Sequence, residues 1–583
     1  MDPVQKKNKR TKSIVALILC AAVLSFSMCA FATVEPPAAP PDGGTAPDGM
    51  GEPPSGGADT MTYDYTGQLN GVLSVGAGQQ LASRDASIGA TDPGQNAALV
   101  QAGGILGLTN GTLHKTGDET NADNCNFYGI NSIFLATGEN TRGYISDSDL
   151  VAESEGSNGL FATDNAVLYA SNNAIHTSAA NSRGLDATYG GTIVANDIDI
   201  TTMGEHCGAV ATDRGGGNIS LTNATLSTSG SGSPLLYSTG NVQIDHVTGT
   251  ASGSQIAGME GLNTILIFNS DLTSTTEGKT ASDPVANGVI IYQSTSGDAE
   301  AATGETATFQ LVKSQLTSSI TSGAMFYVTN TRANILLSGS VLDFDSSEAK
   351  LLRVEGNDDN NWGTAGQNGA QVKFTAREET LSGNITVDSI SSLSLYLLDT
   401  TSYTGAITVK ENEAETEKVE EPVSVSIDSS SKWIVTANSS ISNLSMEEGA
   451  QIVDPTGKTV KVMKNGETII SGDSTYTVTV TGEYNKSIST DESNQISEGL
   501  IDRTEFDAYY QTNTAFGQNG EVELKEVEPV IASDDSESSA EVPAKTASKK
   551  QLYIDIALGA ILLALVVAFF LRRRKKKKEE KET

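Results

Sequence analysis

The sequence predicts an all-β protein whose body is a single-stranded parallel β-helix (a solenoid), with an N-terminal signal peptide and a C-terminal transmembrane helix. Three observations lead there: a repeat of about 25 residues, short bursts of alternating apolar and polar residues, and one long apolar run near each end of the chain. The composition agrees, since aromatic residues make up only 5% of the chain and Gly is abundant at 58 residues. Many short strands joined by turns suit such a composition better than helical bundles.

The repeat consists of an apolar residue, an Asn or Asp two places on, and an aliphatic residue three places after that. Most intervals between the Asn or Asp positions are close to 25 residues, and the last, of 46, fits two units with an atypical residue in one slot. An Ala-Thr or Ser-Thr pair recurs independently with the same period. Two markers with one period indicate a structural repeat. The predicted slots are Asn110, Asp147, Asn172, Asp197, Asn223 and Asn269.

Each unit contains three short strands and three turns, which is one coil of a parallel β-helix stacked on the last at about 4.8 Å. The stretch "GTIVANDIDITT" from Gly191 is typical. Asn and Asp tolerate the left-handed backbone that a sharp corner requires, and the aliphatic residue after them points into the core. We therefore interpret the six slots as structural corner residues whose side chains ladder from coil to coil.

The two ends of the chain have targeting signals. A basic stretch, an apolar run and the Ala30-Phe31-Ala32 cleavage site predict a signal peptide. Near the other end about twenty apolar residues are long enough to cross a bilayer, and the run "RRRKKKK" after them is a positive-inside signal. We expect a single-pass protein of the cell membrane, with its N-terminal bulk extracellular and its C-terminal tail cytoplasmic.

These signals divide the chain into six parts. The Pro- and Gly-rich spacer cannot bury a core, and the acidic segment after the body is interpreted as a stalk, in which "IDRTEFDAYY" from Ile501 has helical spacing. The parts are the signal peptide 1–32, the spacer 33–60, the parallel β-helix 61–483, the acidic stalk 484–550, the transmembrane helix 551–571 and the basic cytoplasmic tail 572–583.

Charge and cysteine content limit the partners. A formal net charge of −35 argues against nucleic acid, which needs clustered Lys and Arg. Signal-peptide cleavage leaves Cys125 and Cys207, which either form a disulfide or remain two buried thiols. The four histidines do not share a slot, so we predict no metal site and no cofactor. Calcium stays an open alternative, because Asp recurs without an ordered ligand motif.

The chain resembles a known family in four stretches: "RGLDATYGG", "CGAVATDRGGG", "SPLLYSTG" and "FYVTNT". They are similar to the pectin-lyase-like right-handed β-helix surface proteins of bacteria and archaea, which are described as adhesin-like, over roughly residues 95 to 485. The resemblance implies a right-handed helix and a surface location. It implies little about activity, which is mostly unassigned in that group.

One constellation suggests carbohydrate chemistry. Asp164, Tyr189 and Asp213 each follow the Ala-Thr marker on successive coils, and Arg214 lies beside the last. In that register the two carboxylates are about 10 Å apart, near the separation of an inverting glycosidase, with an aromatic ring between them for a sugar. The competing interpretation is a solvated corner where Asp turns the chain.

Insertions that break the 25-residue repeat are the other places to look, because solenoids carry binding in such loops. They fall at about 114–128, 273–306 and 355–369. Trp362, in the last of them, is a glycan-stacking candidate together with Tyr189.

The function predicted first is adhesion, through binding of an extracellular glycan or a host or matrix surface by a membrane-anchored protein. The first alternative is a carbohydrate-active enzyme, either a polysaccharide lyase or a glycoside hydrolase, on the same fold. However, "NTD", "GHG" and "RIK", which mark polygalacturonase-like enzymes, do not occur in this sequence. The second alternative is a passive structural surface protein.

Overall fold

The computed structural model describes residues 62–295, 299, 306–358 and 362–516. The predicted signal peptide, spacer, transmembrane helix and basic tail lie outside these residues, as does the predicted stalk from 517 onward. Among the described residues no helix is long and apolar enough to cross a membrane.

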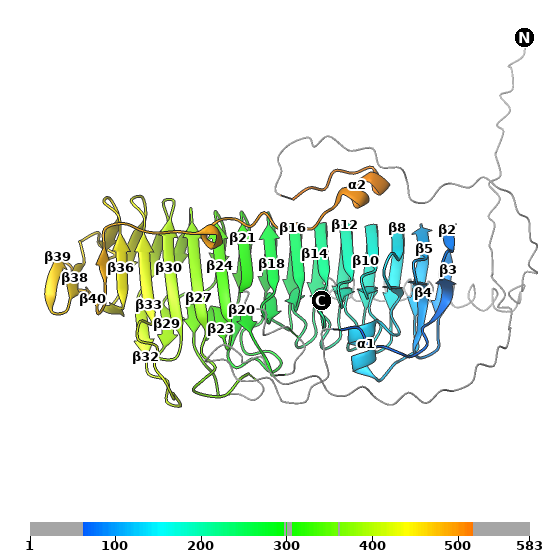
Figure 1. The fold of residues 1–583 in the computed structure, drawn as a ribbon, viewed down its shortest axis with the longest axis horizontal. Coiled ribbons are helices and arrows are strands. Elements are labelled where there is room, and N and C mark those ends of the chain that lie inside the picture. The colour runs from blue at the N-terminus through cyan, green and yellow to red at the C-terminus, as the bar shows by residue number, and fades with distance from the viewer. Residues whose placement is uncertain (1–61, 296–298, 300–305, 359–361, 517–583) are drawn as a thin grey trace, which may run out of the picture. The chain divides into compact units, whose positions relative to one another are not determined.

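The described chain is a β-solenoid built of stacked parallel strands (Figure 1). Sheet A contributes one strand to each of thirteen coils. Its strands, in spatial order, are β1 (Asn70–Val75), β4 (Gln95–Gln101), β7 (Phe134–Thr137), β9 (Leu160–Thr163), β11 (Leu185–Ala187), β13 (Val210–Thr212), β15 (Leu236–Ser238), β17 (Ala257–Glu260), β20 (Asn287–Tyr292), β23 (Ala324–Thr329), β26 (Lys350–Val354), β29 (Ile385–Asp388) and β32 (Ile407–Lys410).

Sheet B supplies the rest of each coil. In four coils its strand is eleven residues long and bends at the corner, and elsewhere the corner separates two shorter strands. Its strands are β2 (Gln80–Arg84), β3 (Ser87–Ala90), β5 (Ile105–Thr109), β6 (Thr112–Lys115), β8 (Arg142–Ala152), β10 (Val167–Thr177), β12 (Thr192–Thr202), β14 (Asn218–Thr228), β16 (Asn241–Ala251), β18 (Thr264–Phe268), β19 (Asp271–Ser274), β21 (Ala307–Val312), β22 (Gln315–Ser318), β24 (Arg332–Ser338), β25 (Val341–Asp343), β27 (Gln371–Arg377), β30 (Ser392–Leu398), β33 (Val423–Ile427), β36 (Asn443–Met446) and β41 (Tyr484–Asn485).

Two four-stranded sheets and three short helices complete the described elements. In sheet D, β38 and β39 pair antiparallel, and they lie at the end of the stack in Figure 1. Sheet C consists of β28 (Thr380–Ser382), β31 (Ser402–Gly405), β34 (Lys432–Val435) and β37 (Gln451–Val453); sheet D of β35 (Ser439–Ile441), β40 (Thr477–Val480), β38 (Lys461–Lys464) and β39 (Glu467–Ile470). The helices are α1 (Ala122–Tyr128), α2 (Thr504–Tyr510) and the 3-10 turn Glu492–Asn494.

The register confirms the repeat of about 25 residues. Val167 pairs with Arg142 on one side and with Thr192 on the other, 25 residues away in each direction. Alternate residues point inward, so that each strand adds to one continuous apolar core, and the aliphatic residue of every predicted slot is buried there. Burial of this core along the whole stack is what stabilises a solenoid, since no single coil encloses enough apolar area.

The corner residues adopt the left-handed backbone. All six predicted slots have φ between 45° and 57°. His246, with φ of 56°, occupies the slot between Asn223 and Asn269, which explains their 46-residue interval as two coils. The side chains bond along the stack: Asn172 Nδ2 donates to Asp147 Oδ1 (2.7 Å), and Asn269 Nδ2 donates to Asp245 Oδ1 beside the slot of the previous coil (2.8 Å).

Replacing Asn172 by Ala should lower the free energy of unfolding by about 1 kcal/mol, because a left-handed backbone disfavours a side chain that cannot bond locally. Asn172→Gly should cost less, since Gly adopts this backbone readily. The buried neighbour Asn173, which bonds Ser148 N and Ile145 O, should cost about 2 kcal/mol when changed to Ala. Denaturant unfolding measures all three; an Ala variant at position 172 as stable as the Gly variant would contradict the corner assignment.

Residues 491–516, here called the strap, lie across the outer face of sheet B (Figure 1). The strap contacts one outward column of that sheet, coil after coil, in the direction opposite to the chain: Asn494 Nδ2 donates to Thr375, Ser497 N to Gln310, and Ile501 N to Gln243. Helix α2 then covers the aromatic end of the column, where Tyr509 stacks on Tyr144 with ring centroids 4.0 Å apart. The strap therefore belongs to the folded body.

Arg503 attaches the strap to the sheet. It is buried, and its five N–H groups all find acceptors, at 2.8 to 3.0 Å. Burial lowers the pKa of Arg503 to about 10. A guanidinium that is buried yet fully hydrogen-bonded holds its acceptors strongly, because none of them has water to replace it. The acceptors are the carbonyl oxygens of Ser220 and Ala195 and the hydroxyls of Ser220, Thr222 and Thr514.

The predicted stalk, 484–550, is thereby corrected for residues 484–516. Tyr484 and Asn485 still pair with β36, and the strap packs on sheet B. The helix expected near Ile501 is present as α2, but it packs on Tyr144 and Tyr169 of the solenoid. The acidic composition of the segment hid the few apolar and cationic side chains that make these contacts.

Arg503→Ala should release the strap, because it removes five hydrogen bonds from buried acceptors at a cost on the order of 3 kcal/mol. Limited proteolysis should then cut within 491–516 at least tenfold faster, while the solenoid stays intact. Lys464→Ala, which removes a half-exposed pair with Glu483, is the matched control. Equal cleavage of the Arg503 variant and the control would show that Arg503 does not hold the strap.

Candidate functional site

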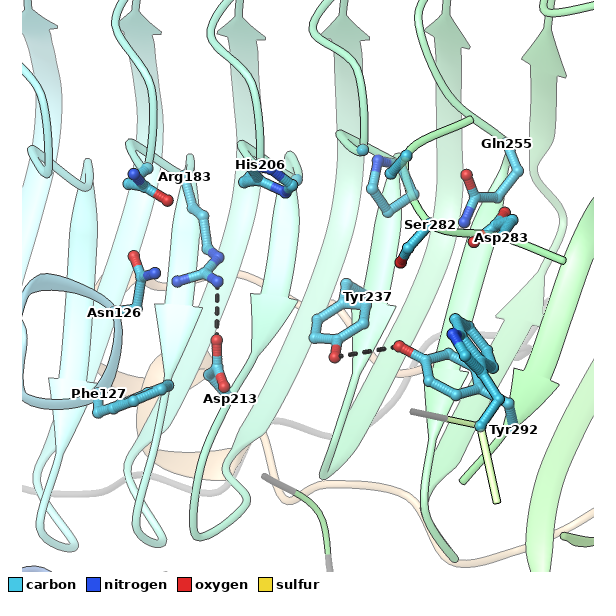
Figure 2. Close-up of a pocket in the computed structure, with 16 residues that line it drawn as sticks. Asn126, Phe127, Arg183, His206, Asp213, Tyr237, Gln255, Ser282, Asp283 and Tyr292 are labelled. Atoms are coloured by element: carbon cyan, nitrogen blue, oxygen red, sulfur yellow. Dashed lines mark hydrogen bonds and ion pairs between the residues drawn. The ribbon is translucent and has the colours of Figure 1, made fainter. Parts of the chain in front are cut away.

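A groove of about 290 Å³ lies on the outer face of sheet A, over strands β11 to β20 (Figure 2). All three insertions that break the repeat contribute to its walls: the first through α1, the second through the loop at 281–283 and Tyr292, and the third through Trp362. The lining residues are Asn126, Phe127, Asn181, Arg183, His206, Gly208, Asp213, Gly232, Pro234, Tyr237, Gln255, Ala281, Ser282, Asp283, Tyr292 and Trp362.

The floor of the groove is set by the register of sheet A. Residues that alternate with the core positions point outward, and pairing stacks them into columns. One such column contains Asp186, Ala211 and Tyr237. In the next, Glu260 pairs with Tyr292, and extension of the β13–β15–β17 register brings Asp213 into the same column, about 10 Å from Glu260.

An ion-pair cluster occupies one end of the floor. Arg183 Nη1 lies 3.0 Å from Asp186 Oδ2, and Arg183 Nη2 lies 2.7 Å from Asp213 Oδ2. All three side chains are buried. Burial opposes the charge of Arg183, but the two carboxylates outweigh it and raise its pKa above the ordinary value. Removing the arginine would leave two buried carboxylates without a partner, so this cluster is fixed in place.

Two tyrosines and a glutamate occupy the other end. Tyr237 Oη donates to Glu260 Oε2 (2.8 Å), and Tyr292 Oη donates to the same oxygen (3.1 Å). Burial, followed by the nearby Glu260 carboxylate, raises the pKa of both tyrosines well above the ordinary value. Their hydrogens are directed at Glu260, so each hydroxyl oxygen offers the groove a lone pair.

The insertion wall carries Asp283, which is only 5% exposed. Its Oδ2 accepts a hydrogen bond from Asn287 Nδ2 (2.8 Å), and burial raises its pKa to about 7. Opposite the loop in Figure 2, Gln255 is 7% exposed, and its Oε1 accepts from Ser254 Oγ (2.6 Å). Within the part of the chain that the structure describes, the Gln255 amide N–H groups have no acceptor, so they are free to meet a ligand.

The predicted Asp164, Tyr189 and Asp213 constellation is not assembled. Tyr189 N bonds Arg214 O, whereas Asp213 N bonds Ala187 O, so Asp213 stands beside Thr188 and not beside Tyr189. The reason is the turn "DRGGG", which is one residue longer than "TYGG" and moves the Ala-Thr marker at 211 by one position. Asp164 remains at a corner with φ of 52°.

The other predicted residues are also placed differently from expectation. Tyr189 is 5% exposed, with Tyr128 stacked at 5.6 Å and Tyr63 edge-on at 5.6 Å. Arg214 lies over the Phe127 ring at 3.8 Å. Trp362 lines the groove but is 5% exposed and packs on Tyr292 at 4.0 Å. Tyr189 and Trp362 thus have no open ring face for a sugar, because aromatic neighbours from other segments cover them.

Cys125 and Cys207 are separate buried thiols, which settles the alternative left open by the sequence. Burial raises the pKa of both, to about 12 and about 11, so neither is a reactive thiolate at neutral pH. Within residues 62–516, where described, no group of three or more His, Cys, Asp or Glu side chains is arranged to hold a metal ion.

Sequence reasoning identified Trp362, Asp213 and the three insertions, but it missed Arg183, Tyr237, Glu260 and Asp283. The outward alternation of sheet A could have singled out Tyr237. Comparisons of the chain with protein-family models, with curated proteins and with solved structures find no match.

Asp283 should make stability depend on pH. Its folded-state pKa of about 7 exceeds the ordinary value of 3.8, so the folded protein binds this proton more tightly and loses stability as pH rises through that window. Asp283→Asn keeps the acceptor for Asn287 but removes the charge. Denaturant unfolding should therefore show equal stability near pH 4 and a more stable variant at pH 8, by at most about 4 kcal/mol. A difference that does not change with pH would contradict the burial of this carboxyl.

Proposed function

We propose that the chain is a surface-attached glycan-binding or matrix-binding protein, and that the groove on sheet A holds the ligand. The observation that carries the proposal is convergence. Three insertions, separated by more than 100 residues of sequence at each step, contribute walls to one groove. Insertions that served only to connect coils would have no reason to meet on one face, whereas solenoid binding loops gather there.

The groove suits an extended polymer. It crosses five successive strands of sheet A, which at 4.8 Å per coil is about 19 Å along the stack. Its lining alternates rings (Tyr237, Tyr292) with hydrogen-bonding groups (Gln255, Asp283), the combination that recognises sugars through their apolar faces and hydroxyls.

The finer fold is part of the same proposal. Parallel strands joined through a crossover are almost always connected in the right-handed sense, which favours the right-handed, pectin-lyase-like form that the sequence resembles. The predicted signal peptide and transmembrane helix support attachment to the cell membrane, with the solenoid outside the cell. Under this proposal the partners are the membrane and an extracellular glycan or host surface.

Carbohydrate cleavage is the second candidate, and Asp283 is the observation that favours it. A buried carboxyl with a pKa of about 7 in a groove wall has the property that a general acid needs at neutral pH. Asp213 and Glu260 replace Asp164 and Asp213 as the carboxylates about 10 Å apart, but each is held by its own partners.

Tyr237→Ala should weaken glycan binding by the full-length protein at least tenfold, because the ring and its hydroxyl form the centre of the groove floor. Tyr396→Ala, on the outward column of sheet B, is the matched control and should bind normally. A glycan array followed by titration of the best ligand measures both.

Equal loss in the two variants would contradict the assignment of the groove. Silence of the wild-type protein on the array would favour the passive structural role. Release of reducing ends or unsaturated uronides, abolished by Asp283→Asn, would favour the enzyme.

A further inference from the structure

The polar atoms that face the groove are mostly hydrogen-bond acceptors. Tyr237 Oη and Tyr292 Oη have given their hydrogens to Glu260, so they offer lone pairs only. Asp283 accepts from Asn287 through one oxygen and keeps acceptor capacity on its carboxyl group. Asn126 Oδ1 is buried and accepts no hydrogen bond from the described residues. A ligand complementary to this set must bring donors.

The charge of the groove has the same bias. Asp213 and Asp283 line it and Glu260 lies under its tyrosines, whereas Arg183 is the cation of the floor and is already bonded to two carboxylates. Lys279, on the insertion, is exposed and acts on the Asp283 carboxyl from the rim. The His206 ring, also exposed, completes the titratable groups that face the cavity.

The same outward column is neutralised differently farther along the stack. There Glu355 lies 2.6 Å from Arg353 Nη2 and 2.7 Å from Lys410 Nζ, so one carboxylate has two cations. In the groove the ratio is reversed, with one guanidinium between two carboxylates. The groove therefore has a local excess of negative charge beside two aromatic rings, an environment that attracts an ammonium group by Coulomb and cation–π interactions.

We infer that the groove selects a glycan with free amino groups, such as an oligomer of unacetylated glucosamine, and rejects uronate polymers. This inference rests on the proposed function and names its ligand class. The protonated amine would donate to Tyr237 Oη, Tyr292 Oη and the Asp283 carboxyl, and the sugar hydroxyls would meet Gln255. A uronate carboxylate would face acceptors and like charge, without a free cation on the groove floor to bind it.

The test titrates the full-length protein with oligomers of equal length: glucosamine, N-acetylglucosamine and galacturonic acid. The glucosamine oligomer should bind at least about tenfold more tightly than either of the others. Asp283→Asn and Tyr292→Phe should each reduce that preference severalfold. Asp283→Asn keeps its bond to Asn287 and Tyr292→Phe keeps its ring, so neither variant should unfold.

Asp149→Asn and Asp199→Asn, two exposed carboxylates on sheet B, are the controls for the general attraction of an acidic protein for cations. If these controls lower glucosamine binding as much as Asp283→Asn does, attraction by net charge explains the binding and the inference fails. Equal or tighter binding of the acetylated or uronate oligomer would overturn the inference while leaving glycan binding intact. If no oligomer binds, the inference and the proposed function fail together.

Discussion

The structure depends on in-register stacking of parallel coils. Each backbone group bonds the equivalent residue of the next coil, so a side chain that points outward in one coil stands in a column with its counterparts above and below. The columns account for the main surfaces: the polar corner ladder, the floor of the groove and the track that the strap follows. A slip of one residue would turn every one of these side chains to the other face.

Register also dictates where the chain can vary. Strands inside the stack cannot lengthen without losing their partners, so extra residues must leave at the turns. The three long insertions contribute to one groove beside sheet A, while the corners next to sheet B stay short and left-handed. The opposite face is covered by the strap, which is fixed by Arg503 and by the rings of α2. The solenoid is thus open to ligands at sheet A and closed over the middle of sheet B.

The sequence predicted those features that depend on local chemistry. Asn172 and its equivalents were recognisable because a left-handed corner restricts residue type, and the core followed from period-two alternation. The site was predictable only as the set of insertions. Asp213 was assigned to the wrong neighbour because a Gly-rich turn gains one residue without any change in composition. Trp362 and Tyr189 were expected to be open, but their burial depends on Tyr292 and Tyr63, whose proximity no local pattern encodes. The contact of Arg503 with Ser220 spans 283 residues and has no sequence signal.

The central claim is that three insertions form one ligand groove on sheet A. Hydrogen–deuterium exchange of the full-length protein, with and without a glucosamine oligomer, tests this directly because it reports each segment separately. The account predicts that the ligand slows exchange together in α1, in residues 277–286 and in 355–358 with 362–369, and leaves the corners and the strap unchanged. Slowed exchange confined to the corner column or to the strap, with these three segments unaffected, would contradict it.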